Sequence, residues 1–316
     1  MTGGTEKFMA DYDVIVLGGG PAGISSLLWC NSLGLRAMLL EQAPELGGQL
    51  LQMFHRVIDY PGVVPENGRE LRDRFQTQLN ELQLRYRLGC QLRAISLNER
   101  TLVCDDEPLT SKAIIIATGA SKRRLGIPGE DRFAIRGGVS FSATRDHGLY
   151  AGKKVCVIGG GDSAVENSLI LSRVCPQVIL IHRSDDFRAR AEWLSEARQT
   201  SNITFLTGFN VKAIEGGDSV ERLIVEDVGS GKLTAIETEG VFVRVGIAPN
   251  TDVFRGQIEL NDAGYVLADQ RQQTSTEWIY AAGDVCNPVC LSVATAVGQG
   301  AIAAKSIARK FGEHDK

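Results

Sequence analysis

The chain has 316 residues, of which 43% are hydrophobic and 23% are charged, and its formal net charge is −4. This composition is typical of a globular protein large enough for two domains. The small negative charge excludes a general attraction to nucleic acid or to an anionic membrane. No apolar run reaches the roughly 18 residues of a membrane span, and the N-terminus lacks a basic-then-apolar secretory signal. We therefore expect a cytoplasmic protein with no membrane segment and no nucleic-acid partner.

The first predicted element is a strand, glycine turn, helix and second strand over residues 13–41. The same pattern returns over residues 155–183. In both segments the first glycine lies 23 residues before the end of the second strand, namely Gly18 before Glu41 and Gly159 before His182. One glycine motif is weak evidence, but two at matching spacing indicate an α/β protein with two Rossmann-like modules.

The first glycine motif is G-x-G-x-x-G, made by Gly18, Gly20 and Gly23. The first glycine permits a tight turn, the second lets the backbone approach a pyrophosphate, and the third lets the helix pack on the strand. The helix N-terminus then offers free N–H groups to the phosphates. Glu41 would accept hydrogen bonds from the adenosine ribose and would repel a 2′-phosphate, which favours FAD or NAD over NADP. The alternative is a glycine turn without a ligand.

Several later segments complete this module. The loop Gly47–Leu50 suits a position along an extended cofactor, although an ordinary turn has the same composition. The apolar runs 114–119 and 278–284 predict two more buried strands, and 294–311 has the apolar spacing of a helix. Asp284, at a strand end, could bind the ribityl hydroxyls of a flavin. We therefore predict a discontinuous FAD-binding domain, 1–122 plus 252–316, with a second dinucleotide-binding domain, 123–251, inserted into it.

The second glycine motif reads G-x-G-x-x-A at Gly159, Gly161 and Ala164, a form often found where NADP binds. Where the first module has Glu41, this one has His182 and Arg183, which could accept a 2′-phosphate or stack on adenine. Asp185 and Asp186 weaken the positive field there, and a solvated basic turn is the alternative. The expected contacts of this site also include the following residues: Asp162, Ser163 and Arg188.

Together these motifs resemble the low-molecular-weight thioredoxin reductase family over essentially the whole chain. The landmarks are GGGPAG, GGQL, YPG, IIATGA, GVS, GGGDSAVE, HRxxxFRA and AAGDV. The resemblance implies two three-layer ββα domains, a homodimer, and FAD contacts at Gly18, Gly20, Gly23, Glu41, Gln49, Thr118 and Asp284. We expect the neighbouring residues to contribute as well: Pro21, Ala22, Gln42, Gly48, Leu50, Ala117, Gly119 and Gly283.

The chain departs from that family at two places. Where the family has C-A-T-C-D, this sequence has Ser142-Ala-Thr-Arg145-Asp146, so neither redox cysteine is present. Where the family has H-R-R, it has His182-Arg183-Ser184, so one arginine expected for NADPH is missing. This pattern resembles the diflavin-linked disulfide oxidoreductases of oxygenic photosynthetic bacteria. That resemblance implies two FAD molecules per chain, one in the former NADPH site; the alternative is one FAD plus NADPH.

The seven cysteines include one close pair, Cys286 and Cys290. The others, Cys30, Cys90, Cys104, Cys156 and Cys175, lie in or near apolar patterns and are interpreted as small buried hydrophobic residues. The histidines lack the spacing of metal ligands.

The close pair lies directly after the segment that ends in Asp284. Asn287 is a favoured N-cap and Pro288 a favoured first residue, so we predict a helix that starts at Pro288. That helix start would lower the pKa of a nearby thiol, and the spacing allows the Cα separation of about 4.4–6.8 Å that a disulfide needs.

We therefore interpret Cys286 and Cys290 as the catalytic dithiol of a flavin-dependent disulfide oxidoreductase, acting on a thiol or disulfide substrate. Two alternatives stay open. A thioredoxin reductase-like NAD(P)H:ferredoxin oxidoreductase would also lack the cysteines at 142–145. A non-catalytic flavin-binding protein could use the same cysteine pair as a redox sensor.

Overall fold

The computed structural model describes residues 10–54 and 56–314 and divides the chain into two compact units. The first unit is formed by the chain up to Ser121 and from Ala248 onward, and the second by Lys122–Ile247. The two connections between the units pair as short strands, β7 (Ala120–Lys122) and β16 (Ile247–Pro249). The chain therefore leaves the first unit once and returns to it once.

The first unit is built on a sheet whose parallel part runs in the order β3-β2-β1-β6, with β17 pairing on β6. An antiparallel extension adds β5 and β4 to the first half of β6. The strands of this sheet have the following bounds: β1 Tyr12–Leu17, β2 Ala37–Leu40, β3 Tyr86–Arg87, β4 Leu92–Ser96, β5 Thr101–Cys104, β6 Glu107–Ile116 and β17 Ile279–Ala281. The strands predicted at 114–119 and 278–284 are confirmed and lie side by side, with Ile114 opposite Ile279.

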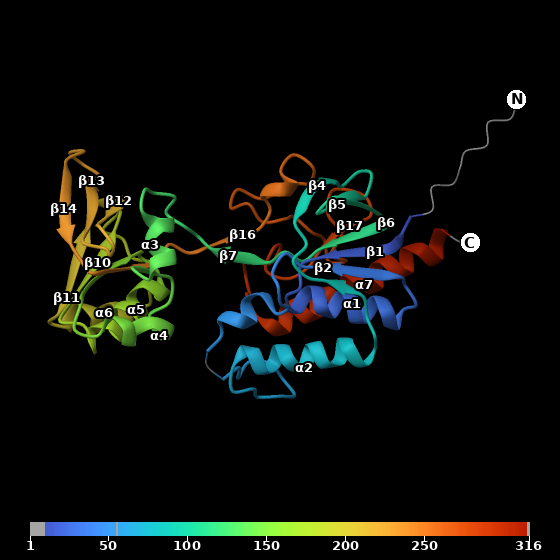
Figure 1. Ribbon diagram of the computed structural model, residues 1–316, viewed down its shortest axis with the longest axis horizontal. Helices are drawn as coiled ribbons and strands as arrows, with labels where there is room; N and C mark the ends of the chain where they lie inside the picture. The colour runs from blue at the N-terminus through green and yellow to red at the C-terminus, as the bar shows by residue number, and fades with distance from the viewer. Residues whose placement is uncertain (1–9, 55, 315–316) are drawn as a thin grey trace, which may run out of the picture. The chain divides into compact units, whose positions relative to one another are not determined.

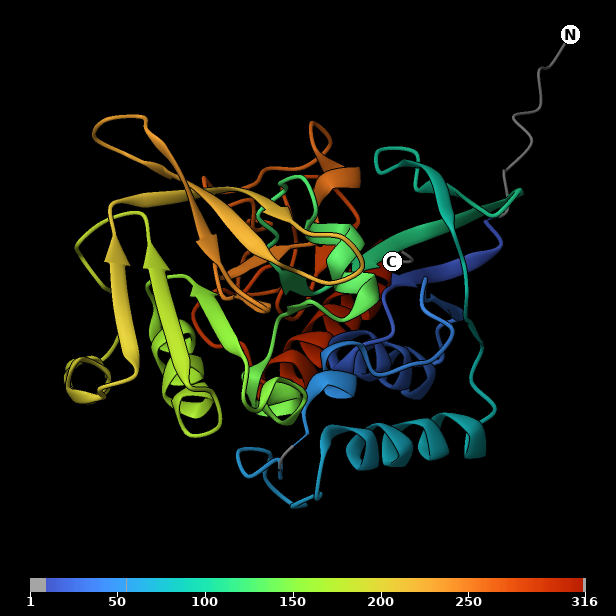
Figure 2. The ribbon, with the colours of Figure 1, turned by 60° about the vertical axis from the view of Figure 1, so that its left-hand side comes forward.

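Alternating side chains of β1 pack into two hydrophobic cores, one on each face of the sheet. Val14 and Val16 face the helices, whereas Ile15 and Leu17 face the opposite layer, as the two-residue period of a strand requires. The helices are α1 (Pro21–Ser32), α2 (Gly68–Glu81) and α7 (Val293–His314), with a 3-10 turn η1 (Gly48–Gln52) between β2 and α2. Figures 1 and 2 show α7, the last helix, beside α1, the first.

The two helices approach closely at a glycine. A Cβ at Gly300 of α7 would lie 2.4 Å from the carbonyl oxygen of Ala22 in α1. The same Cβ would lie 3.0 Å from Oγ of Ser26, also in α1, so a larger side chain at position 300 would clash with α1. The end of the chain is therefore part of the wall behind the first glycine turn.

The second unit repeats this plan with a parallel sheet in the order β11-β10-β9-β15-β8. A separate antiparallel sheet, β12-β13-β14, packs its apolar side chains with those of β9 and β10 in one core, and α5 packs on the other face. The strands are β8 Val139–Ser140, β9 Lys154–Ile158, β10 Gln177–His182, β11 Ile203–Thr207, β12 Phe209–Glu215, β13 Arg222–Asp227, β14 Leu233–Glu237 and β15 Gly240–Val243. The helices are α3 Glu130–Arg136, α4 Ala143–Asp146, α5 Asp162–Ser172 and α6 Ala191–Gln199, with the 3-10 turns η2 His147–Tyr150 here and η3 Asp252–Phe254 in the first unit.

The cysteines outside the close pair correct one interpretation. Cys30, Cys156 and Cys175 are buried and free, as expected. Cys90 and Cys104 are also buried, but they are joined in a disulfide, with Cα atoms 5.6 Å apart. Interpreting them as unpaired was wrong, because Cys90 precedes β4, Cys104 ends β5, and the antiparallel pairing of β4 with β5 brings them together.

Candidate functional site

The first glycine turn lies at the carboxyl end of β1 and has the geometry of a dinucleotide site. Gly18 has φ +109°, and a Cβ there would lie 2.3 Å from the carbonyl oxygen of Ala117. A Cβ at Gly23 would lie 1.8 Å from the carbonyl oxygen of Gly18. Gly20, by contrast, faces open space within 4 Å. Two glycines are thus required by packing, while the third leaves room where a pyrophosphate would approach.

The start of α1 leaves its amide groups available. The helix begins at Pro21, and its N-cap Gly20 has no side chain to accept from them. Glu41 lies beside this turn, where its Oε2 accepts from the amide of Gly19 at 2.5 Å and its Oε1 from the amide of Ala43 at 2.7 Å. The carboxylate is therefore fixed next to the helix N-terminus, where it could receive ribose hydroxyls.

Asp284 is the second carboxylate at this edge of the sheet. Its Oδ2 accepts from Nε2 of Gln49 at 2.5 Å, which links the turn after β17 to η1. Burial raises the pKa of Asp284, and the hydrogen bond from Gln49 only partly offsets that rise. Gly283, with φ +83°, makes the turn, and its amide donates to Gln299 at 2.8 Å. A partly buried carboxylate with one hydrogen-bond partner among the residues that the structure describes can bind further hydroxyl groups.

The remaining predicted contacts lie around the same edge. Thr118 Oγ1 donates to the carbonyl oxygen of Asn250 at 2.8 Å, and Gln42 donates to Gln91 at 3.4 Å. A Cβ at Gly48 would lie 3.2 Å from Cα of Gly20, so η1 closes over the glycine turn. The other predicted contacts follow the ends of β1 and β6 or lie in η1: Ala22, Leu50, Ala117 and Gly119.

The predicted helix start at Pro288 is wrong. Helix α7 begins at Val293, and Ser292 caps it, since Ser292 Oγ accepts from the amide of Thr295 at 3.3 Å. Asn287 instead closes a local turn, because its Oδ1 accepts from the amides of Val289 and Cys290. Both residues favour capping roles, but the side chain of Asn287 is already used within the loop 286–292.

This loop holds the free thiols of Cys286 and Cys290 in different surroundings. Cys286 is half-buried, with its Sγ 3.4 Å from the carbonyl oxygen of Gly283 and 3.7 Å from Oε1 of Gln272. Cys290 is exposed, and its Sγ lies 3.7 Å from Oγ of Ser292. Burial, with the nearby Asp284, raises the pKa of Cys286 to about 12. The expected lowering by a helix start is therefore wrong for this thiol, because α7 begins seven residues later.

The segment Ser142–Asp146, which contains no cysteine, forms an ion pair. Arg145 donates from Nε and Nη2 to the carboxylate of Asp146, both at 2.6 Å, and Ser140 Oγ also donates to it at 2.6 Å. Burial raises the pKa of Asp146, but these hydrogen bonds outweigh it and the pKa is lowered overall. A carboxylate held in the charged form by an arginine is poorly suited to donate a proton at neutral pH.

The second glycine turn, after β9, has a backbone conformation similar to that of the first. Gly159 has φ +145°, and a Cβ there would lie 2.2 Å from the carbonyl oxygen of Arg244, whereas Gly161 faces open space within 4 Å. Helix α5 begins at Asp162, followed by Ser163, and its N-cap has no side chain. The same room for a pyrophosphate is therefore present at this turn.

The loop after β10 folds back onto this turn. The amide of Arg188 donates to the carbonyl oxygen of Gly160 at 2.8 Å, and Arg190 donates to Asp162 from its amide at 2.7 Å and from Nε at 3.0 Å. His182 Nε2 lies 3.2 Å from the carbonyl oxygen of Asp186, and burial lowers the pKa of His182. A largely neutral His182 favours adenine contact over phosphate contact, so charge at this site comes from the exposed Arg183 and Arg188.

Two cations of this unit were missed by sequence reasoning. Lys122 ends β7, and Arg244 follows β15 directly, at the same carboxyl edge as Gly159. The available signal was the run Gly240-Val-Phe-Val-Arg244, an apolar strand that ends in a cation.

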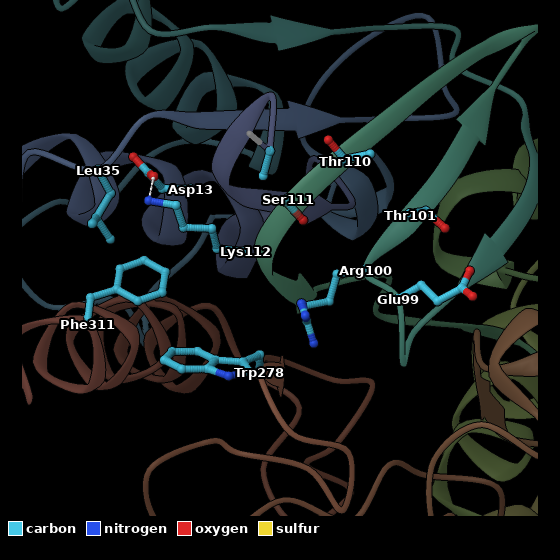
Figure 3. A pocket seen from close by; sticks show the side chains of 11 residues that line it. Asp13, Leu35, Glu99, Arg100, Thr101, Thr110, Ser111, Lys112, Trp278 and Phe311 are labelled. Atoms are coloured by element: carbon cyan, nitrogen blue, oxygen red, sulfur yellow. Dashed lines mark ion pairs between the residues drawn. The ribbon is translucent and has the colours of Figure 1, made fainter. Parts of the chain in front are cut away.

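A cavity of about 650 Å³ lies elsewhere in the first unit, at the amino ends of the paired parts of β1 and β6 (Figure 3). Trp278 and Phe311 stack on one side of it with ring centroids 5.1 Å apart, and Asp13 pairs with Lys112 at 2.8 Å. The glycine turn lies at the opposite ends of these strands. This cavity is therefore distinct from the dinucleotide site.

Two further searches concern the residues that the structure describes. Within them, no group of three or more His, Cys, Asp or Glu side chains could hold a metal ion. Across the same residues, no helix combines the length and the apolarity needed to cross a membrane.

Comparison with known proteins agrees with this geometry. A family model described as pyridine nucleotide-disulphide oxidoreductase matches residues 12–300. The chain belongs to that family. It is 36% identical over 312 residues to a thioredoxin reductase of Mycolicibacterium smegmatis, covering 96% of this chain and 98% of the relative.

Solved structures place it within the same group. The crystal structure of Lactococcus lactis thioredoxin reductase in its FR conformation has a TM-score of 0.78 and 31% identity, covering 96% of this chain and 99% of that one. The crystal structure of T. acidophilum thioredoxin reductase has a TM-score of 0.75 and 29% identity, covering 96% of this chain and 99% of that one. This member of the family is thus a thioredoxin reductase-like flavin disulfide oxidoreductase, an FAD-dependent enzyme that acts on a sulfur group.

Proposed function

We propose that the Cys286–Cys290 pair is the redox centre of this oxidoreductase, and that it exchanges two electrons with an FAD in the first site. The observation that carries the proposal is that the free thiols Cys286 and Cys290 lie in one loop, which starts two residues after Asp284. The segment 142–145 contains no cysteine, so the sulfur chemistry of the family needs another location in this chain.

The first site fits FAD on the residues present. Gly20 leaves room for the pyrophosphate, and α1 offers uncapped amides to it. Glu41 would hold the ribose of the adenosine, and Asp284 with Gln49 would hold the ribityl chain. FAD bound there would supply a two-electron acceptor or donor for thiol chemistry.

The two thiols suit different roles because they differ in exposure. Cys290, on the surface, exchanges with the disulfide or dithiol of a substrate, and Cys286, half-buried beside the turn of Asp284, is the inner thiol. Oxidation of the pair forms one S–S bond and releases two protons and two electrons. Asn287 supports this exchange, because it donates to the carbonyl oxygen of Cys290 at 3.2 Å and so keeps both cysteines in one closed turn.

We propose further that a second FAD occupies the dinucleotide site of the second unit. The predicted domain for this site, 123–251, has bounds close to those of the compact unit Lys122–Ile247. The open Gly161 and the exposed Arg183 and Arg188 suit a pyrophosphate and an adenosine of either cofactor. A serine stands at position 184 where an arginine is expected, and His182 already contacts the carbonyl oxygen of Asp186. Fewer cationic groups are therefore available to bind the 2′-phosphate of NADPH. We also propose a cytoplasmic homodimer that acts on a thiol or disulfide partner, since relatives carry the name thioredoxin reductase.

The roles of the thiols are tested by trapping. We expect Cys286→Ser to form a stable mixed disulfide with an oxidised dithiol protein through Cys290, because the resolving thiol is absent. Cys290→Ser is the matched control. It removes the exposed thiol that would attack the substrate, so no mixed disulfide should form. Mass spectrometry of the non-reduced protein measures the adduct.

Thiol-dependent flavin reduction that is unchanged in both variants would overturn the proposal. Rapid bleaching of the flavin by NADPH in the absence of any thiol would instead favour the NAD(P)H:ferredoxin oxidoreductase. Slow turnover with every electron donor, together with redox-dependent partner binding, would favour the sensor.

A further inference from the structure

Three cations gather at the carboxyl ends of β8 and β15 in the second unit. We name Lys122, Arg145 and Arg244 the cation cluster. Arg244 follows β15 and donates from Nη1 to the carbonyl oxygen of Phe141, just beyond β8, at 2.5 Å. Arg145 lies in α4, which follows β8. Lys122 ends β7, and the amide of the next residue, Arg123, donates to the carbonyl oxygen of Gly246 at 2.9 Å, two residues beyond Arg244.

The negative charge near the cation cluster does not balance it. Asp146 is the carboxylate that acts electrostatically on Lys122, and Arg145 already holds it in a two-point ion pair. In residues 10–54 and 56–314, no ion pair involves Lys122 or Arg244. Glu166, which acts on Arg244 electrostatically, is exposed. Lys122 and Arg244 are half-buried, whereas Arg145 is exposed. The cluster therefore keeps a net positive charge, two of whose three carriers are partly removed from water.

This arrangement is unfavourable without a further partner. Burial, with Arg244 and Arg145 nearby, lowers the pKa of Lys122 to about 8, and burial lowers the pKa of Arg244. Nε of Arg244 is buried and finds no acceptor among the described residues. A buried donor without an acceptor costs about 1–3 kcal/mol. An anionic group bound here would supply both the charge and the acceptor.

The position of the cluster indicates which part of a dinucleotide it would meet. All strands in the order β11-β10-β9-β15-β8 are parallel, but β10 and β11 lie on one side of β9 and β15 lies on the other. Dinucleotides lie across the crevice at such a switch point. His182 ends β10, on the side where the adenosine half lies. Arg244 and Arg145 follow strands on the other side, so they lie on the side of the redox ring.

The two cofactors of this family differ in the charge of that ring. Nicotinamide is positive when oxidised and neutral when reduced, whereas flavin is neutral when oxidised and negative when reduced and deprotonated. A cationic subsite repels oxidised nicotinamide and attracts reduced flavin. We propose that Lys122, Arg145 and Arg244 form the ring subsite of the second dinucleotide site and selectively stabilise the reduced, negatively charged form of a flavin. This inference rests on the second FAD of the proposed function.

The experiment measures midpoint potentials of the purified flavoprotein by spectroscopic redox titration. We use Lys122→Met and Arg244→Gln, since glutamine keeps a donor toward Phe141 and methionine removes a charge that burial disfavours. The control is Arg136→Gln, which removes an equal charge from an exposed ion pair with Asp218 in the same unit. Each cluster variant should bind the reduced second flavin about tenfold less tightly relative to the oxidised form, or about 30 mV in a two-electron couple.

The first flavin and the control should not change. Midpoint potentials that are equal in wild type, both variants and control would overturn the inference. The second flavin is recognised as the one absent from a Gly159→Ala variant, whose Cβ would meet the carbonyl oxygen of Arg244 at 2.2 Å.

Counting FAD per chain separates failure of the inference from failure of the proposed function. If one FAD is released, the second FAD is wrong, and the cluster is tested with NADPH and NADP⁺ by equilibrium dialysis. The cation cluster then predicts that NADPH, with its uncharged ring, binds about tenfold more tightly than NADP⁺. This preference should be lost in Lys122→Met and Arg244→Gln. Equal binding of both nucleotides to the wild type would overturn it.

Discussion

The two units build the same strand, glycine turn, helix and strand, yet they line its carboxyl edge with opposite charges. In the first unit the edge carries Glu41 and Asp284; in the second it carries Arg183 and Arg244. The backbone of the two turns is alike, since Gly18 and Gly159 each lie against a carbonyl oxygen of the neighbouring strand end. The fold therefore provides a place for a dinucleotide, whereas the side chains at the strand ends choose its chemistry.

The largest expected effect comes from breaking each turn separately. Gly18→Ala and Gly159→Ala each place a Cβ 2.2–2.3 Å from a carbonyl oxygen at a φ that favours glycine. We expect each variant to lose its own dinucleotide by more than about a hundredfold in affinity, roughly 3 kcal/mol, and to keep the other. If both sites hold FAD as proposed, the FAD released per chain measures this. Gly298→Ala in the first unit and Gly148→Ala in the second are the controls, because each Cβ meets open space away from the glycine turns. Loss of both cofactors in either variant would show that the sites are not independent.

A second contrast between the units is covalent. The disulfide Cys90–Cys104 lies in the first unit, whereas Cys156 and Cys175 of the second are free. Cys104→Ser should lower the free energy of unfolding of the first unit by about 3 kcal/mol, because the bridge closes a loop with a sequence separation of 14 residues. Hydrogen exchange in β4 and β5 reports this directly. Dithiothreitol should reproduce the loss in wild type and add nothing in the variant; a wild type indifferent to reductant would contradict it.

The smallest expected effects come from two aspartates with opposite pKa shifts. Burial raises the pKa of Asp284, whereas hydrogen bonds from Arg145 and Ser140 outweigh burial and lower that of Asp146. Asp146 therefore contributes stability above about pH 4, which is lost as pH falls through its folded pKa. The contribution of Asp284 is present below about pH 4 and is lost as pH rises through its folded pKa.

Substitution should reveal the difference in flavin-free protein at pH 7. Asp146→Asn should lower the free energy of unfolding by about 2 kcal/mol, since it weakens hydrogen bonds to a charged group. Asp284→Asn should raise it by up to about 1 kcal/mol, since it removes a desolvated charge. Urea denaturation measures both, and the same sign for the two variants would refute the contrast.

Much of this architecture could be predicted from the sequence, because it rests on repeated local patterns. The two glycine motifs, the alternation Val14, Ile15, Val16, Leu17 and the late strand at 278–284 all have short-range signals. The start of α7 could not be predicted as well, because Asn287 and Ser292 both favour capping and only the three-dimensional turn decides between them. The disulfide depended on strand pairing, and the cation cluster depended on three segments meeting.

The return of the chain through β16 has a consequence for how the protein is made. Residues 122–247 are contiguous and emerge together during synthesis, so the second unit can complete its core first. The first unit cannot, because β17 and α7 contact β6 and α1 and are translated only after the second unit. Until β17 and α7 have been translated, one side of β6 and one face of α1 lack their partners, and this exposed apolar surface is where a chaperone would bind the nascent chain.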